Sequence, residues 1–115
     1  MYEESFVVER LVERDREIFR VQGELDIATA PQLESELAGL EGRAGKPVID
    51  LTECTFIDSG GFHVLARACT QIGASVVCPR EPLRWVFDIV AVERICPMYD
   101  SLEQALAATS EEKAG

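Results

Sequence analysis

The sequence lacks the features of a membrane, exported or nucleic-acid-binding protein. No apolar run approaches the ~18 residues that a membrane-spanning helix needs. The N-terminal segment MYEESFVVER lacks the basic stretch and the long apolar run of a signal peptide. Only 11 basic residues stand against 21 acidic ones, and the net charge of −10 repels phosphate backbones and anionic lipids. We therefore expect a soluble, cytoplasmic protein without membrane insertion or direct nucleic-acid contact.

Metal-binding and redox motifs are also missing. The four cysteines (Cys54, Cys69, Cys78 and Cys96) form no C-x-x-C pair, and the single histidine, His63, has no cysteine near it in the sequence. In a cytoplasmic chain such cysteines are usually small buried hydrophobes. The sequence thus predicts no metal, no cofactor and no disulfide.

Nucleotide-binding and hydrolase motifs are absent as well. There is no P-loop and no G-x-G-x-x-G. Ser59 lies between an expected strand and helix, as the nucleophile of G-x-S-x-G hydrolases does, but Ile57 replaces the first glycine of that motif. The possible base, His63, lies only four residues further on, whereas serine hydrolases bring the base from elsewhere. These patterns favour an interaction module, and a small serine hydrolase is the enzyme alternative.

The 115 residues suffice for one α/β domain, spanning residues 1–115, with a core of its own. Two apolar runs, Phe6–Val12 and Ile18–Gln22, flank a charged connector and predict an N-terminal hairpin, whose second strand we expect to end at Gly23. Residues 111–115 are expected to fray. Helix and strand patterns then alternate, which predicts a mixed sheet packed against about four helices.

The expected elements after the hairpin have recognisable starts, stops and periods. They are a helix opened by a Thr29/Gln32 capping box, a central strand Val48–Leu51, a helix from Phe62 to Ile72 stopped by Gly73, a strand Ala74–Cys78, a helix from Pro82, an edge strand Arg94–Cys96 and a helix opened by a Ser101/Gln104 capping box. The strand, helix and strand from residue 48 to residue 78 form a βαβ unit with parallel strands.

The most informative stretch is the turn Asp58-Ser59-Gly60-Gly61. Its glycines permit a sharp turn with unusual torsions, and its aspartate and serine are both favourable helix N-caps. A helix N-terminus at Ser59 would suit a phosphate, because free amides and the positive end of the helix dipole lie there. Asp26 also follows an expected strand, and parallel strand order would bring it to the same edge of the sheet as Ser59.

Four segments together resemble the STAS domain of bacterial anti-sigma factor antagonists. They read GELDIATAP from Gly23, VIDL from Val48, FIDS from Phe56 and SLEQAL from Ser101. The resemblance spans nearly the whole chain, and its most specific parts are the G-E-L-D segment and the D-S-x-G turn. It implies a STAS-like fold without enzymatic activity.

The resemblance also implies a phosphorylation switch. The unphosphorylated domain would bind an anti-sigma factor that is also a serine kinase, phosphorylation of Ser59 would release it, and a serine phosphatase would restore it. Gly60, where the family usually has Ser or Thr, leaves Ser59 the only hydroxyl acceptor in the turn. The alternative is a STAS accessory subunit of a lipid or anion transport system without phospho-switching. The implied partner-binding residues are Glu24, Asp26, Thr29, Asp58, Ser59, Gly60, Gly61 and His63.

Overall fold

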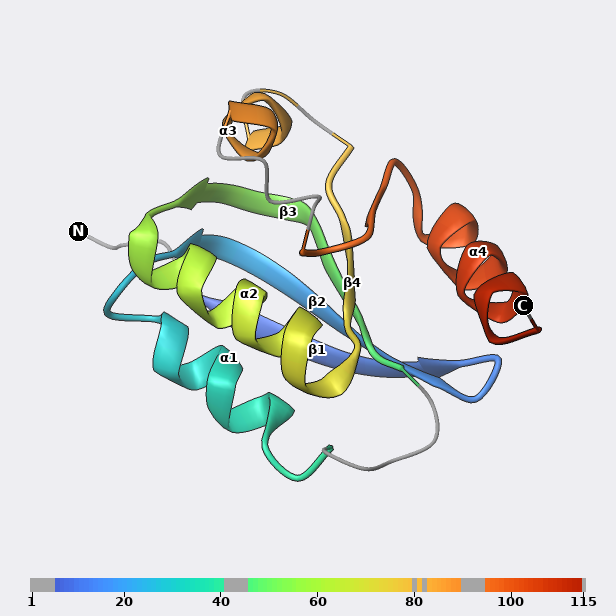
Figure 1. Cartoon of the computed structure of the whole chain (residues 1–115). Helices are drawn as coiled ribbons and strands as arrows, with labels where there is room; N and C mark the ends of the chain where they lie inside the picture. Colours follow the sequence, from blue (N-terminus) through green and yellow to red (C-terminus); the bar gives the residue numbers. More distant parts are fainter. Residues whose placement is uncertain (1–5, 41–45, 80, 82, 90–94, 115) are drawn as a thin grey trace.

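The computed structural model describes residues 6–40, 46–79, 81, 83–89 and 95–114. The strands are β1 (Val7–Glu13), β2 (Arg16–Leu25), β3 (Val48–Ile57), β4 (Ser75–Val77) and β5 (Met98–Tyr99), and the helices are α1 (Ala30–Leu37), α2 (Ser59–Ile72), α3 (Leu83–Ile89) and α4 (Leu102–Ala114). The strands form one sheet in the order β1-β2-β3-β4-β5 (Figure 1). Only β1 and β2 pair antiparallel, so the mixed sheet with an N-terminal hairpin and four helices confirms the predicted fold class.

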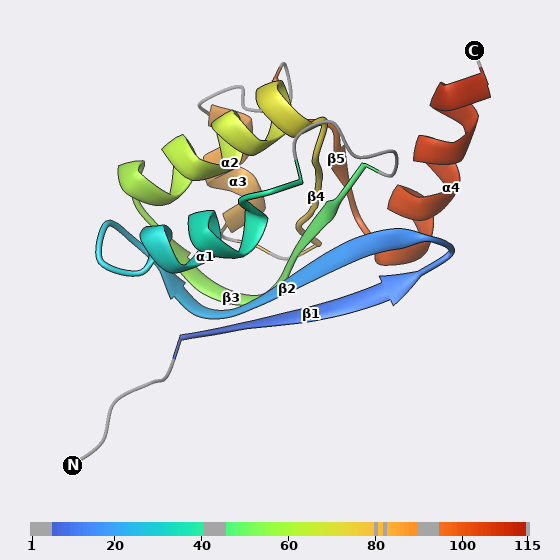
Figure 2. The same cartoon turned by 90° about the horizontal axis from the view of Figure 1, so that it is seen from below.

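The two faces of the sheet pack against different helices. Neighbouring strand residues point to opposite faces, and Phe19 belongs to the large core cluster that also holds buried residues of α1, α2 and α3. Ile18 instead packs with Ala105 and Leu106 of α4. Figure 2 shows α1 and α2 together over the sheet and α4 set apart at one end of it. The sheet therefore lies between two apolar layers, of which the α1–α3 layer is the larger.

The hairpin is paired as the sequence predicts, and its second strand is longer than expected. Arg14 and Asp15 form a two-residue turn with φ of 54° and 64°, the backbone geometry that matches the twist of paired strands. Gly23 does not end β2, contrary to the prediction. It takes a φ of 101° beside a register shift against β3, so the strand bends there and continues to Leu25.

The central βαβ unit is confirmed with one change of length. β3 continues from Val48 to Ile57, well beyond the predicted end at Leu51, because β2 pairs with it as far as Ile57, whereas β4 pairs only with Val48–Asp50. Helix α2 ends at Gly73, which takes the left-handed conformation with φ 72°. Its predicted solvent face, His63, Arg67 and Thr70, is exposed.

The two predicted capping boxes have different outcomes. At α4 the backbone N–H of Gln104 donates to Ser101 Oγ at 3.1 Å, and Gln104 Oε1 accepts from the N–H of Asp100 at 3.1 Å, one residue earlier than the predicted partner. At α1 the prediction is wrong, because Thr29 makes no side-chain cap bond there. The Thr29 hydroxyl instead makes its hydrogen bonds within the turn before α1, and this turn is part of the candidate functional site described below.

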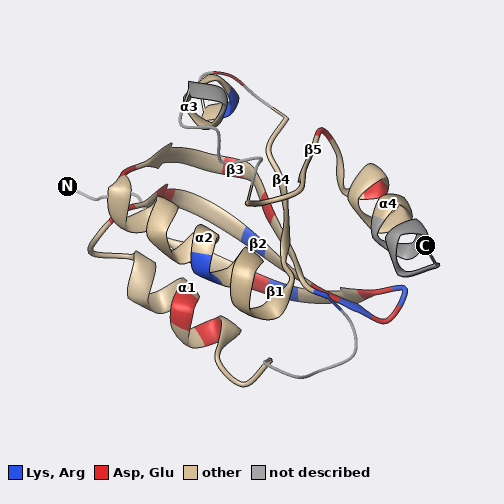
Figure 3. Cartoon of the chain, viewed as in Figure 1, with Lys and Arg blue, Asp and Glu red and all other residues tan. Residues whose placement is uncertain are grey.

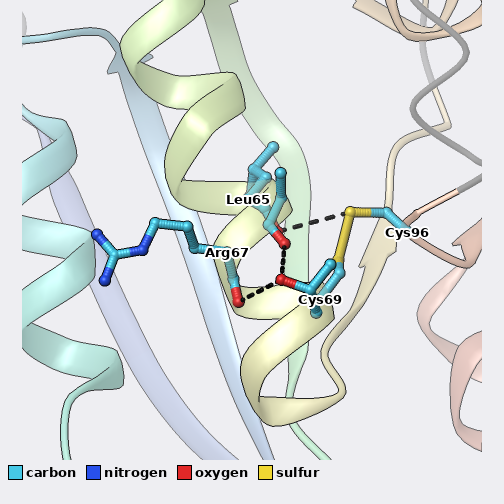
Figure 4. Close-up of a disulfide and its surroundings, with 6 residues drawn as sticks. Leu65, Arg67, Cys69 and Cys96 are labelled. Carbon is cyan, nitrogen blue, oxygen red and sulfur yellow. Dashed lines mark hydrogen bonds between the residues drawn. A yellow bond between two sulfur atoms is a disulfide. The ribbon is translucent and has the colours of Figure 1, made fainter.

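Two predictions near the C-terminal part of the chain are wrong. The last strand is β5, Met98–Tyr99, whereas Cys96 is in a bend; Arg94 and Pro82 lie outside the described residues. Cys69 of α2 and Cys96 form a disulfide, although the sequence predicted none (Figure 4). Their positions 27 residues apart carry no motif, so only folding brings their Cα atoms to 5.3 Å. In the described part of the chain no helix is long and apolar enough to cross a membrane.

Candidate functional site

Two loops meet at the carboxyl ends of β2 and β3. These strands are parallel, and their last residues, Leu25 and Ile57, are register partners. The backbone N–H of Asp58 donates to Leu25 O at 3.3 Å, which joins the start of the second loop to the end of β2. The parallel pairing thus brings Asp26 and Ser59 to one edge of the sheet, as predicted. We call the loops 26–29 and 58–61, with the strand ends that precede them, the β2–β3 edge.

The side chain of Asp58 braces the β2–β3 edge. Its Oδ1 accepts from the N–H groups of Gly60 at 2.8 Å and Gly61 at 3.1 Å, so it is the N-cap of α2. Its Oδ2 accepts from the N–H of Ile27 at 3.2 Å in the other loop. The Asp58 carboxylate therefore accepts hydrogen bonds from two backbone N–H groups at the start of α2 and also joins the two loops.

Residues 60 and 61 are glycine because there is no space for a Cβ atom at either position. This corrects the expectation that the two glycines provide unusual backbone torsions. Neither residue is among those with positive φ in the described chain. A Cβ at position 60 would lie 2.9 Å from Ile27 Cα, and one at position 61 would lie 2.5 Å from Leu25 O and 2.7 Å from Ile57 Cγ1. The glycines therefore let α2 begin directly against the end of β2 and the 26–29 loop.

The 26–29 loop is a turn closed by its own side chains. Asp26 Oδ1 accepts from the N–H groups of Ala28 and Thr29, both at 3.0 Å. The Thr29 hydroxyl donates to Glu24 O at 2.7 Å and accepts from the N–H of Asp26 at 2.8 Å. The backbone hydrogen bond from Thr29 is the main cause that holds the pKa of Asp26 below its ordinary value of 3.8. Asp26 and Thr29 thus shape the loop, in addition to any contact that they make with a partner.

Ser59 presents its hydroxyl to solvent at the first residue of α2. The side chain is exposed, and it makes no hydrogen bond with the residues that the structure describes. His63 is exposed one turn further along α2 and likewise makes none with the described residues. The pair therefore lacks the serine–base hydrogen bond on which a hydrolase depends. Ser59 is accessible to a modifying enzyme.

Sequence reasoning missed two apolar residues at the same edge. Ile27 is 76% exposed at the tip of the 26–29 loop, and Phe56 is 47% exposed beside Glu24, its register partner. Both lie inside the motifs that carry the family resemblance. Their exposure could not be read from those motifs, because an apolar residue in a loop or at a strand end is as often buried.

The β2–β3 edge carries charge of one sign. Residues 24–29 and 56–63 contain Glu24, Asp26 and Asp58 and no Lys or Arg. Figure 3 shows red segments and no blue one where β2 and β3 end and α2 begins. No group of three or more His, Cys, Asp or Glu that could share a metal ion occurs among residues 6–40, 46–79, 83–89 and 95–114. The edge is thus an acidic surface with two exposed apolar side chains.

The fold and the β2–β3 edge define a small α/β domain whose polar loops gather at one side of a mixed sheet. The sequence matches the STAS domain over residues 10–105, and the chain belongs to the STAS domain family. It is 35% identical over 94 residues to BtrV of Bordetella bronchiseptica, which carries the provisional name of anti-sigma factor antagonist. These residues cover 76% of this chain and 81% of that protein.

Solved structures share this fold. The crystal structure of an anti-sigma factor antagonist from Mycobacterium paratuberculosis superposes with a TM-score of 0.80 at 27% identity, over 90% of this chain and 93% of that one. A sulfate transporter family protein from Wolinella succinogenes superposes with a TM-score of 0.69 at 18% identity, over 91% and 93%. The fold therefore occurs among proteins named for both of the functions that the sequence left open.

Proposed function

We propose that this protein is a non-enzymatic, cytoplasmic anti-sigma factor antagonist that is switched by phosphorylation of Ser59. Unphosphorylated, it binds an anti-sigma factor that is also a serine kinase and thereby frees the sigma factor. The phosphorylated domain is released, and a serine phosphatase returns it to the binding state. The observation that carries the proposal is the exposed side chain of Ser59 on a braced helix N-terminus at the β2–β3 edge. The name of the Bordetella relative supports the same class of function.

A phosphate on Ser59 acts only if it lies inside the interface with the partner. To shift the partner from 99% bound to 99% free, phosphorylation must change the binding free energy by about 5.5 kcal/mol. An exposed like-charge contact contributes only ~0.2–1 kcal/mol and is screened by salt. The phosphate adds about −1.5 to −2 charges. Such a charge is sufficient where desolvation and steric exclusion act too, so the proposal requires Ser59 to lie beneath the bound partner.

The local geometry also limits how far the domain itself can accommodate the phosphate. The amides of Gly60 and Gly61 at the α2 N-terminus already donate to Asp58 Oδ1. A phosphate on Ser59 would therefore find these two donors occupied and would stand beside a carboxylate. The helix dipole still favours negative charge there. The free domain remains folded after phosphorylation, and the loss of binding arises at the interface.

The charged and apolar side chains at the β2–β3 edge predict the chemistry of the surface with which the partner binds. We expect arginine or lysine side chains on the partner opposite the carboxylates of Glu24, Asp26 and Asp58. We expect an apolar patch between these basic residues, opposite the exposed side chains of Ile27 and Phe56. Within this interface Thr29, Gly60 and Gly61 maintain the loop shapes, and His63 lies at its border on α2. Under this proposal the partner covers Ile27 and Phe56, since protein interfaces combine apolar side chains with a polar rim.

A pull-down with wild type, Ser59→Ala and Ser59→Asp, read by mass spectrometry, tests the proposal. We expect wild type and Ser59→Ala to retain the same kinase, and Ser59→Asp to lose it. Ser35→Asp is the matched control, because it adds the same charge on the exposed face of α1, outside the β2–β3 edge. Equal binding of Ser59→Asp and wild type at physiological salt would refute the placement of Ser59 beneath the partner.

The alternative, an accessory subunit of a lipid or anion transport system, makes the opposite prediction. It expects stable co-purification with transport subunits and no phosphate on Ser59 in cells. The switch expects a mass increase of one phosphate at that residue. The hydrolase alternative predicts that an activated phosphonate labels Ser59; we expect no labelling, because no base is hydrogen-bonded to it among the described residues.

A further inference from the structure

The disulfide between Cys69 and Cys96 connects two parts of the chain that backbone pairing does not join. Cys69 lies on the last turns of α2, and Cys96 lies two residues before β5. The 27-residue separation between them includes β4 and α3. The bond therefore closes a loop that contains α3 and attaches the far end of that loop to the helix whose first residue is Ser59.

Helix α3 depends on few other contacts with α2. It has seven residues, too short to be stable without packing. Its Phe87 is fully buried and meets Phe62 of α2 edge to face, with ring centroids 5.2 Å apart. Trp85 on the same helix is 58% exposed, and it is the only tryptophan of the chain. The surface that α3 presents thus depends on how its loop is held.

A small reagent can reach the Cys69 sulfur from solvent, whereas Cys96 is fully buried. Cys69 lines an open pocket of about 200 Å³ together with Lys46, Ile95 and Pro97. The pocket opens to solvent beside Cys69, and the ammonium group of Lys46 attracts an anionic thiol or disulfide of low molecular weight. The other two cysteines, Cys54 and Cys78, are buried and do not line this pocket. Burial raises the pKa of the Cys54 thiol, which keeps it protonated and unreactive.

The fold also accommodates the reduced pair. Cys96 Sγ lies 3.6 Å from Leu65 O, within reach for a thiol that donates a weak hydrogen bond (Figure 4). A reduced Cys96, although fully buried, would therefore keep an acceptor for its proton.

We propose that Cys69 and Cys96 form a reversible oxidation site that attaches the α3 loop to α2, with a small disulfide as oxidant. The Cys69 thiolate attacks one sulfur of the small disulfide, whose other half leaves as a thiolate and takes a proton. Cys96 then loses its proton, attacks the Cys69 sulfur and expels the second half. The balance is two protein thiols and one small disulfide giving one protein disulfide and two small thiols. A dithiol reverses the reaction.

The consequence is a surface that responds to redox conditions, independent of the proposed function at Ser59. The oxidised chain attaches the end of the α3 loop to α2, whereas the reduced chain holds α3 by its packing and by the hydrogen bonds of Arg84 to Cys78 O at 3.1 Å and Asp100 Oδ1 at 2.6 Å. Closing a loop of this length restricts the unfolded chain and raises stability. We expect an apparent Tm higher by about 5 °C or more in the oxidised protein.

The test compares the full chain after oxidised glutathione with the full chain after dithiothreitol. Intact mass should fall by two hydrogen atoms on oxidation, and a non-reducing peptide map should join the Cys69 and Cys96 peptides. Acrylamide quenching of Trp85 should increase on reduction, and the Tm should fall. Cys54→Ser should behave as wild type, and Cys69→Ser should show the reduced values under both conditions.

The outcomes decide the proposal even if a variant folds poorly, because the mass, the peptide map and the Trp85 quenching are all measured on wild type. A map that joins any other pair, or no loss of mass under oxidised glutathione, would overturn the site. A correct bond without a change in Tm or in quenching would overturn its role in holding α3. Loss of partner binding in Ser59→Asp is a separate measurement and bears only on the proposed function.

Discussion

Gly61→Ala is expected to destabilise the protein even though alanine is the better helix former. The residue lies in the first turn of α2, and its φ is not positive, so the alanine backbone is permitted. Helix propensity alone would stabilise the variant by about 1 kcal/mol. The added methyl group, however, would lie 2.5 Å from Leu25 O and 2.7 Å from Ile57 Cγ1. Both neighbours are buried at strand ends and cannot move independently.

The steric cost should exceed the propensity gain. Overpacking of a well-packed core costs about 1–3 kcal/mol and occasionally more, and two contacts below 3.0 Å place Gly61→Ala at the upper end of that range. The net loss of unfolding free energy is then about 2 kcal/mol. For a domain of this size the corresponding decrease in Tm is on the order of 8 °C. Urea unfolding followed by circular dichroism measures the free energy, and calorimetry measures the Tm.

Gly60→Ala is the matched control. Its methyl group would make one contact below 3.0 Å, to Ile27 Cα at 2.9 Å, where the methyl group of Gly61→Ala would make two shorter ones against buried strand ends. We therefore expect a smaller loss of unfolding free energy than for Gly61→Ala, with the same gain in helix propensity. If Gly61→Ala proved as stable as wild type, or if Gly60→Ala cost more than Gly61→Ala, the close approach of α2 to β2 would not be what requires these glycines.

Three further predictions concern the same edge. Asp58→Ala should lower the unfolding free energy by about 1–2 kcal/mol in urea titrations, because it removes the cap of α2 and the bond from Ile27; Asp58→Asn, which keeps an acceptor oxygen, should lose less, and an unchanged Asp58→Ala would contradict the brace. The Asp26 carboxyl should titrate below 3.8 by NMR. Since its pKa is lowered on folding, its contribution to stability is complete above the unfolded pKa and is lost as pH falls through the folded one; Asp26→Asn should remove that part of the acid dependence. Finally, surface plasmon resonance should show that added salt slows association with the kinase far more than it speeds dissociation, and equal effects on both rates would argue against a basic partner surface.

The local patterns of the sequence predicted which helices and strands form better than they predicted the residues at which these end. The hairpin, the parallel βαβ unit and the Gly73 stop all follow from residue types at fixed spacings, whereas the choice of Asp58 over Ser59 as the cap of α2 does not. Gly23 and Leu51 were read as strand ends, and β2 and β3 continue past both. A strand continues for as long as neighbouring strands provide backbone hydrogen-bond partners. The local sequence pattern does not show which strands will be its neighbours.

The candidate site divides in the same way. The sequence indicated Ser59 as a hydroxyl at a helix start and Asp26 as a carboxylate after a strand. It could not indicate that Asp58 Oδ2 accepts from the N–H of Ile27, or that Ile27 and Phe56 are exposed at the same β2–β3 edge. These facts depend on two loops meeting across paired strands, about 30 residues apart in the chain.

By itself the sequence determined the fold class, the position of the polar turn at residues 58–61 and the acidic character of the chain, because these depend on periodicity, capping residues and net charge. The tertiary structure alone decided why residues 60 and 61 are glycine and that Cys69 meets Cys96. Both are distances between atoms remote in the chain. Such distances are set by the packing of α2 against the sheet, which no pattern of neighbouring residues contains.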